Sequence, residues 1–176
     1  MTAEAIDWKK ANPQQEIFQA GQKILIGDIE IDTFTIPHDA IDPVAFCFRS
    51  QGVKLGLVTD LGYMPDSVRL QIEGCQLLVI ESNHDLDMLK VGPYPWFVKQ
   101  RVMSRVGHLS NQAVSDFLTD HFDRRAETIV LAHLSDNNNH PEIARLFATS
   151  ALAKIGVNET RVVVAPQDRT TEVFKF

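Results

Sequence analysis

Three short segments each place one polar side chain where an apolar, strand-like run ends. They are Ile-Pro-His-Asp at 36–39, Leu-Val-Thr-Asp at 57–60 and Leu-Ala-His-Leu-Ser at 131–135, and they present His38, Asp60 and His133. Imidazole nitrogens and carboxylate oxygens bind zinc and similar divalent cations. A carboxylate can also serve two cations, one with each oxygen. We therefore expect these three residues to meet at a metal site where strands end.

A fourth segment, Gly-His-Leu-Ser-Asn at 107–111, adds a histidine of a different kind. Gly107 permits close backbone approach, and a helix predicted to begin at Asn111 favours an anion at its start. His108 is therefore a candidate general acid for a phosphate leaving group, and Glu81, at the end of another strand, is the candidate group that orients its imidazole. The other histidines are predicted to be surface or loop residues: His84, His121 and His140.

Each of these signals also has an ordinary structural interpretation. An aspartate in a turn such as Asp60-Leu61-Gly62 often bonds its own backbone. A histidine that leaves a buried strand, as His133 is predicted to do, also fits a core residue bonded to a carbonyl. The order and spacing of the segments together, and no single residue, favour a site.

Four strands followed by strand-helix units are predicted to position these residues. The first four strands, at 23–26, 29–36, 44–49 and 54–59, are expected to form an antiparallel meander. Later strands are expected at 76–81, 128–134 and 161–165, with helices at 66–72, 95–103, 111–122 and 141–154. The first twenty residues are predicted as a short helix or irregular lead-in, and 171–176 as an edge strand. The fold class is α/β, a mixed sheet flanked by helices, in a single domain over residues 1–176.

Composition narrows the class of protein. The 176 residues are 44% hydrophobic and 23% charged, which is typical of a globular protein with a substantial core. No run of 18 apolar residues predicts a membrane span, and the first residues lack the pattern of a signal peptide, so we expect a cytoplasmic protein. Cys47 and Cys75 are predicted to be free buried thiols, with a disulfide as the alternative.

The net charge of −6 argues against a basic surface along the whole sequence. Four cations nevertheless cluster in one short region: Lys90, Lys99, Arg101 and Arg105. They fit either a solvated helix face or a phosphate-facing patch beside His108.

Taken in order, the segments resemble the metallo-β-lactamase superfamily in its phosphodiesterase and nuclease branch. They resemble most the WalJ (YycJ)-type exonuclease-like proteins, which are related to ribonuclease Z. The resemblance runs from about residue 22 to the end. It rests on Val-Thr-Asp-Leu-Gly at 58–62, Ile-Glu-Ser-Asn-His-Asp at 80–85 with Gly-Pro-Tyr-Pro at 92–95, the segment at 107–111, and the segment at 131–135 with Asn138-Asn139.

The resemblance implies the C-terminal part of an αββα sandwich that hydrolyses phosphodiesters, as a DNA exonuclease does, with two zinc or manganese ions. It implies that His38 is a ligand of the first metal, that Asp60 bridges the two, and that His133 is the last ligand of the second. His108 is implied to contact the scissile phosphate, with Glu81 as its partner.

One departure is large, because the family carries an upstream His-x-His-x-Asp-His motif and His38 is the first histidine here. We expect a C-terminal piece of a longer protein or a truncated reading frame. Three ligands shared between two metals predict weak metal binding and little hydrolysis. The missing segment is expected to leave an open sheet that favours self-association. Two alternatives are a non-catalytic remnant that binds a partner or nucleic acid, and a hydrolase of another substrate, such as a cyclic nucleotide or a small ester.

Overall fold

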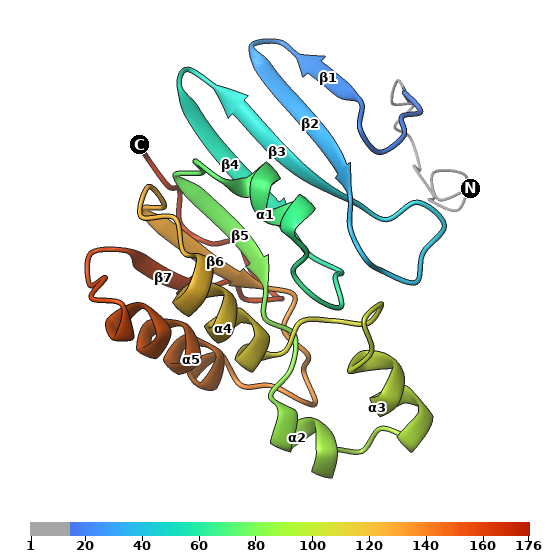
Figure 1. Cartoon of the computed structure of the whole chain (residues 1–176). Helices are drawn as coiled ribbons and strands as arrows, with labels where there is room; N and C mark the ends of the chain where they lie inside the picture. Colours follow the sequence, from blue (N-terminus) through green and yellow to red (C-terminus); the bar gives the residue numbers. More distant parts are fainter. Residues whose placement is uncertain (1–14) are drawn as a thin grey trace.

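The computed structural model describes residues 15–176, which form one sheet of seven strands in chain order (Figure 1). The strands are β1 (Lys23–Ile26), β2 (Ile29–Thr35), β3 (Val44–Ser50), β4 (Val53–Val58), β5 (Leu77–Glu81), β6 (Thr128–Ala132) and β7 (Arg161–Val164). Neighbours from β1 to β4 are antiparallel, and those from β4 to β7 are parallel. The predicted α/β class, with a meander leading into strand-helix units, is confirmed.

Five helices complete the described part of the chain: α1 (Asp66–Ile72), α2 (Leu86–Val91), α3 (Trp96–Val102), α4 (Asn111–His121) and α5 (Pro141–Lys154). The sequence pattern missed α2, because six residues are too few to show a helical period. Its start is nevertheless encoded, since the Asp85 carboxylate accepts hydrogen bonds from the backbone N–H groups of Asp87 and Met88. Ser110 caps α4 in the same way through Ala113.

Both ends of the chain were predicted less well. Residues 171–176 are not a strand, so that prediction is wrong. The tail instead uses side chains to hold β7, with Glu172 paired to Arg161 and the Arg161 guanidinium 5.9 Å from the Phe174 ring centre. Of the predicted lead-in, residues 1–14 lie outside the described residues, and 15–20 contain no helix.

The hydrophobic core lies on one face of the sheet. Sheet residues that alternate along each strand point to this face, and α1, α4 and α5 pack over it (Figure 1). The sheet side of the core consists of residues exposed by 4% or less: Ala45, Cys47, Val58, Leu78, Ile80, Ile129 and Leu131. The strands β5 and β6 have almost wholly apolar sequences, and they lie at the centre of the parallel half of the sheet.

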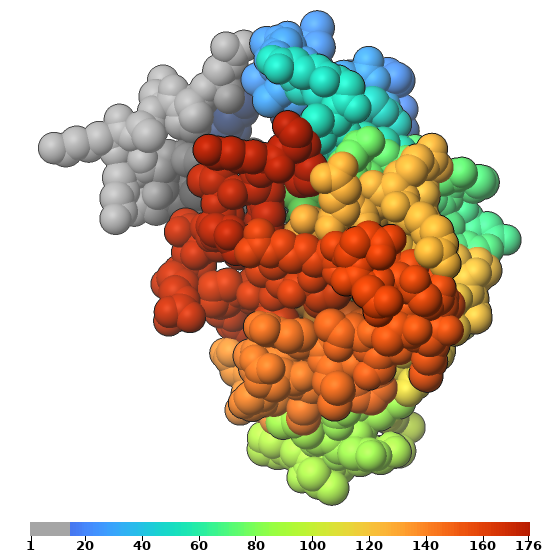
Figure 2. Space-filling view, turned by 90° about the vertical axis from the view of Figure 1, so that its left-hand side faces the viewer, coloured from blue at the N-terminus to red at the C-terminus, as the bar shows by residue number. Residues whose placement is uncertain are grey.

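The opposite face is also apolar but has no helix on it among residues 15–176. Cross-strand pairing places Phe46, Leu57 and Val79 in one row, with Phe48 and Leu55 in the next. All five are half-buried, and none belongs to the main core. Chain ends approach this face: Phe18 contacts Phe46 edge-on at 6.0 Å between ring centres. Figure 2 shows the C-terminal segment, in dark red, on the side away from the green residues around α1.

Parallel pairing brings the carboxyl ends of β4, β5 and β6 to the same edge of the sheet. Asp60, Glu81 and His133 all lie at this edge, and α2 and α3 lie beyond it, at the bottom of Figure 1. The strand order therefore gathers the residues that the sequence separates by up to 73 positions. Within residues 15–176, no helix is long and apolar enough to cross a membrane.

His84 corrects a sequence-based expectation, because it is 1% exposed and not a surface residue. Its backbone joins α4, where the Asn111 N–H donates to the His84 carbonyl. Neither ring nitrogen has a hydrogen-bond partner among the described residues. Burial lowers the pKa of His84 to about 4, because a charged imidazole is poorly solvated there.

We expect His84 to make the protein acid-sensitive. Its pKa is lower in the folded than in the unfolded state, so the folded state binds fewer protons, and stability is lost as pH falls from about 6.5 towards 4. Between pH 7 and pH 5 the His84 contribution is about 2 kcal/mol of unfolding free energy. Urea unfolding of wild type and His84→Met at both pH values measures it. Parallel losses in the two proteins would contradict this assignment.

Candidate metal centre

The two loops that follow β4 and β6 are both bent through unusual backbone. Asp60 has φ +60° and His133 has φ +57°, in the left-handed region that residues with a Cβ seldom adopt. Each such conformation costs about 1–3 kcal/mol and persists only where the surroundings hold it. Because both bent residues carry metal-binding side chains and lie at the same sheet edge, the strain points to a functional site.

Two glycines permit close backbone packing around the site, Gly62 against Arg105 and Gly107 against the end of α3. A Cβ on Gly62 would lie 2.3 Å from the backbone carbonyl carbon of Arg105, and one on Gly107 would lie 2.2 Å from the Val102 oxygen. Neither distance is tolerable for a side chain, so only glycine permits this packing. The Asp60 loop is also tied to the chain before β3, because Gly62 N–H donates to the Pro37 carbonyl at 3.0 Å.

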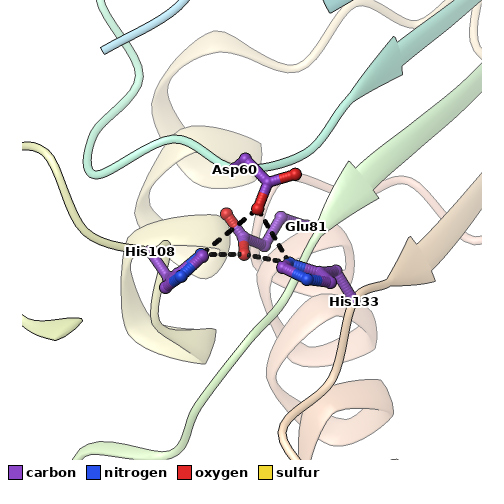
Figure 3. Close-up of side chains that lie close together, drawn as sticks. All are labelled: Asp60, Glu81, His108 and His133. Atoms are coloured by element: carbon purple, nitrogen blue, oxygen red, sulfur yellow. Dashed lines mark hydrogen bonds and ion pairs between the residues drawn. The ribbon is translucent and has the colours of Figure 1, made fainter. Parts of the chain in front are cut away.

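Glu81 is the centre of the site and is fully buried (Figure 3). Its Oε1 lies 2.7 Å from Nδ1 of His108 and 2.7 Å from Nδ1 of His133. Its Oε2 accepts backbone hydrogen bonds from Leu61 at 3.1 Å and Leu109 at 3.3 Å. One carboxylate therefore holds both histidines and the loops on either side of them.

The charge of Glu81 determines how the two imidazoles are protonated. Burial alone would raise the pKa of Glu81, but the hydrogen bonds from His108 and His133 outweigh it, and the pKa lies below its ordinary value. An ionised carboxylate only accepts hydrogen bonds, so both Nδ1 atoms must carry the proton. In the neutral rings this leaves a lone pair on each Nε2. The hydrogen bond to Glu81 also raises the pKa of His133.

Asp60 adds the second carboxylate to this cluster. Its Oδ1 lies 3.6 Å from Nδ1 of His133 and 3.8 Å from Nδ1 of His108. The Asp60 side chain is 43% exposed, whereas Glu81 is enclosed, so Asp60 is the carboxylate that an incoming ion can reach. Asp60, Glu81, His108 and His133 each offer an atom within 4.8 Å of the others.

His38 lies beside this cluster. Its Nε2 is 4.0 Å from Asp60 Oδ1, its ring centre is 5.1 Å from that of His108, and its Nδ1 is 3.2 Å from the Gly107 carbonyl. Asp39, expected to be its neighbour, lies 3.5 Å from Nε2 and also pairs with Arg101. The structure thus brings Asp60 and His133 together and places His38 beside Asp60, outside the group of donors that lie within 4.8 Å of one another.

The donor set suits one divalent cation. Both Glu81 oxygens already accept from protein groups, so Glu81 fits the role of a residue that holds metal-binding histidines rather than a ligand. The remaining donors are the Asp60 carboxylate and the imidazoles of His108 and His133, with His38 beside them, and these are ligand types that zinc and similar divalent cations bind. Two cations, each with a closed set of protein ligands, would need more donors than these.

A pocket of about 560 Å³ opens onto His108 and His133. Its lining includes Asp136 and Asn137, from the polar loop of residues 135–139 that follows β6. A larger pocket of about 700 Å³ contains none of the site residues and lies beside α1 and the end of α4.

The last two asparagines of the polar loop behave differently, because Asn138 and Asn139 are buried. Asn139 exchanges hydrogen bonds with Asn111 and donates to the Ser82 carbonyl, which ties this loop to α4 and to the end of β5. Sequence reasoning missed this network and the bond from Glu81 to His133. A run of asparagines shows polarity but not which of its members are enclosed.

Comparison with known proteins shows similar sequences and a similar fold. The chain is 41% identical over 147 residues to exodeoxyribonuclease YycJ of Bacillus anthracis, covering 81% of this chain and 54% of the relative. It is 36% identical over 146 residues to exodeoxyribonuclease WalJ of Streptococcus pneumoniae serotype 2 (strain D39), covering 83% and 54%. The structure resembles the metallo-β-lactamase fold protein YhfI of Bacillus subtilis, with a TM-score of 0.61 at 19% identity, over 88% of this chain and 54% of that one.

The described part of the chain has the metallo-β-lactamase fold. Its sequence is similar to those of the YycJ and WalJ proteins over about four fifths of its length. No family model matches it. The chain spans about half the length of the curated relatives it matches. The metallo-β-lactamase fold is therefore shown for the part described, while the activity of the whole protein has to be argued from the site.

Replacing Glu81 with glutamine is expected to weaken metal binding without touching a ligand. The amide carbonyl can accept from His108 or His133, but the amide nitrogen would face the backbone N–H groups of Leu61 and Leu109 as a second donor. Loss of such supporting carboxylates typically lowers metal affinity 10–100-fold. Zinc titration against a chromophoric chelator measures the change, with the exposed Glu159→Gln as the matched control. Equal zinc affinity in wild type and Glu81→Gln would remove Glu81 from this role.

Proposed function

We propose that this site is part of a metal-dependent hydrolase of phosphodiester bonds, of the DNA exonuclease kind. The observation that carries the proposal is the convergence of Asp60, His108 and His133 around the buried Glu81. Support comes from the relatives, which are named exodeoxyribonucleases. The two carboxylates of Glu81 and Asp60 also give the site negative charge that attracts a divalent cation.

The proposed role of each residue depends on which of its nitrogen or oxygen atoms are not already hydrogen-bonded to Glu81. Asp60 and His133 would hold a metal ion through a carboxylate oxygen and Nε2, with His38 as a further ligand. Such a cation, when bound, neutralises the charge that develops on a phosphate during hydrolysis. His108 would act as the catalytic acid in its imidazolium form, which Glu81 stabilises through Nδ1. The Nε2 proton would pass to the departing oxygen and leave the ring neutral.

We propose further that this chain alone has an incomplete site. The three ligands His38, Asp60 and His133 would be shared between two zinc or manganese ions, and neither ion would have a closed ligand set. The half-buried apolar row of Phe46, Leu57 and Val79 supports the same proposal, because a full domain would enclose it. On this view residues 1–176 are one domain in part, and copies of the chain would associate through the open sheet.

The compartment proposed is the cytoplasm. Cys47 and Cys75 are both buried free thiols. Cysteines remain thiols in a reducing environment such as the cytoplasm. The same observation decides between the two sequence-based alternatives for these cysteines in favour of free thiols.

A second candidate function is binding without catalysis. The shortage of metal donors favours it, because a chain that loads a cation poorly can still keep the surface through which its relatives contact a substrate or partner. The substrate or partner would be nucleic acid, a small phosphodiester or another polypeptide.

Metal loading and hydrolysis test the proposed function together. We expect the isolated chain to bind at most one zinc per molecule and to release little product from a single-stranded DNA substrate with zinc or manganese. Asp60→Asn and His133→Ala should each lower zinc affinity at least about 10-fold, because each removes a direct ligand. Asp136→Asn, at the pocket rim, is the control for a nearby charge.

A hybrid that joins this chain to the unmatched part of the YycJ relative should restore metal-dependent hydrolysis, and Asp60→Asn should abolish it. Two zinc ions and rapid cleavage by the chain alone would overturn the proposed incompleteness. A hybrid that loads metal but cleaves no phosphodiester would overturn the proposed activity.

Self-association is tested separately. Sedimentation should show concentration-dependent dimers or larger species, because the apolar row on the open face is only half-buried. Phe48→Lys should shift the distribution to the monomer, whereas Leu146→Lys on exposed α5 should not. Monomers at all concentrations would exclude association through the open sheet.

A further inference from the structure

Two buried cysteines lie next to each other on the helix-covered face of the sheet. Cys47 is paired with Gly56 across the β3–β4 ladder, so the two positions share a face. A Cβ placed on Gly56 would lie 3.2 Å from Sγ of Cys75. The Cys75 sulfur therefore occupies the space beside Cys47 that a side chain on β4 would otherwise fill. Both residues belong to the hydrophobic core, and both are free thiols.

This pair lies at the other end of β5 from the candidate metal centre. Cys75 stands before the first residue of β5, whereas Glu81 is the last residue of that strand. The turn that carries Cys75 follows α1, and the Cys75 N–H donates to the Ile72 carbonyl at 3.2 Å. Chemistry at the two sulfur atoms can therefore proceed apart from metal binding and hydrolysis.

A cation is held close to the two sulfur atoms by a shared hydrogen-bond acceptor. The Gln71 carbonyl accepts from Sγ of Cys47 at 3.3 Å and from Nζ of Lys54 at 2.6 Å. The Lys54 ammonium also donates to the Glu73 carbonyl at 2.5 Å, which fixes it over the turn before Cys75. A neighbouring cation favours the thiolate, and the thiolate is the reactive form of a cysteine.

The two sulfur atoms differ in access and in acidity. Cys75 lines the pocket of about 700 Å³ beside α1 and the end of α4, whereas Cys47 is not among the residues that line it. A hydrogen bond from Cys47 lowers the pKa of Cys75, with burial opposing this effect and Lys54 adding to it. The same hydrogen bond, together with burial, raises the pKa of Cys47. When Cys75 ionises, the Cys47 proton can turn to it from the Gln71 carbonyl.

We propose that Cys75 and Cys47 form a hydroperoxide-reactive pair, in which Cys75 is oxidised first from the pocket and Cys47 then closes a disulfide with it. The Cys75 thiolate attacks one peroxide oxygen and the O–O bond breaks. The departing alkoxide or hydroxide takes a proton from solvent, and Cys75 becomes a sulfenic acid.

The second step joins the two sulfur atoms. The Cys47 sulfur attacks the Cys75 sulfur, the S–O bond breaks, and the departing hydroxide leaves as water with the proton of Cys47. The pair loses two electrons in all, and the hydroperoxide gains them. A thiol reductant reverses the reaction, so the free thiols are restored in a reducing compartment.

Thiol counting tests the proposal directly, because the chain has only two cysteines. The reduced chain is treated with hydrogen peroxide, and a chelator is present to prevent oxidation by trace metals. A chromogenic thiol reagent in denaturant should then show a fall from two thiols per chain to none. Dithiothreitol should restore both thiols, and peptide mass spectrometry should find Cys47 joined to Cys75 within one chain.

Single variants assign the order of the two steps. In Cys47→Ala, Cys75 should stop at the sulfenic acid, which dimedone traps as a stable adduct. In Cys75→Ala, Cys47 should keep its thiol, because it lacks both the pocket and the neighbouring sulfur. Circular dichroism melts check that each variant folds. Disulfide formation in wild type needs no substitution, so it tests the pair even where a variant is unstable.

The role of the cation has its own variant. Lys54→Met should slow the loss of thiols at least about 3-fold, because without the ammonium a smaller fraction of Cys75 is thiolate. Lys154→Met, which removes an exposed lysine at the end of α5, is the matched control and should leave the rate unchanged. Equal rates in wild type and Lys54→Met would contradict the assigned activation.

Two thiols that persist in peroxide-treated wild type would overturn the proposal. Disulfides between chains on a non-reducing gel would do the same, as would a dimedone adduct on Cys47 in place of Cys75. These measurements use neither a bound metal nor a phosphodiester, so their outcome is independent of the proposed hydrolase function.

Discussion

The fully buried carboxylate of Glu81 is the constraint on which the site depends. A buried charge costs several kcal/mol in lost hydration, so it persists only when its oxygens are well supplied with donors. Here two imidazoles and two backbone N–H groups supply them. A hydrogen bond to a charged group contributes about 1.5–3 kcal/mol, so four of them offset the cost of burial. The donors come from the segments after β4, before α4 and after β6, and satisfying one charge therefore holds three loops in place.

This arrangement also explains why strained backbone persists at the sheet edge. Asp60 and His133 each follow a strand through left-handed backbone, and each lies next to a group bound by Glu81. The energy that holds the loops to the carboxylate is available to maintain the bends. Replacing either bend by ordinary backbone would turn the side chain away from the others, so the strain and the convergence of the ligands have one origin.

The sheet and the site are each supported by other parts of the structure on one side only. Helices α1, α4 and α5 enclose one face of the sheet, while on the other face Phe46, Phe48, Leu55, Leu57 and Val79 are only half-buried. The site likewise has a supported inner side, built on Glu81, and fewer donors than two cations require. Both features fit a chain that spans about half the length of its relatives.

Local patterns in the sequence predicted most strands and helices. Apolar spacing, the Gly27-Asp28 turn between β1 and β2, and the Ser110 cap of α4 each depend on only a few neighbouring residues. Local patterns also placed His38, Asp60 and His133 at strand ends. They could not predict that His84 and Lys99 are buried, that Glu81 binds two histidines, or that the tail pairs through Arg161 rather than as a strand. Sequence by itself determined which groups stand at the ends of strands. Only the tertiary structure decided which of them face one another and which are enclosed, because burial and hydrogen bonding depend on segments that are distant in the chain.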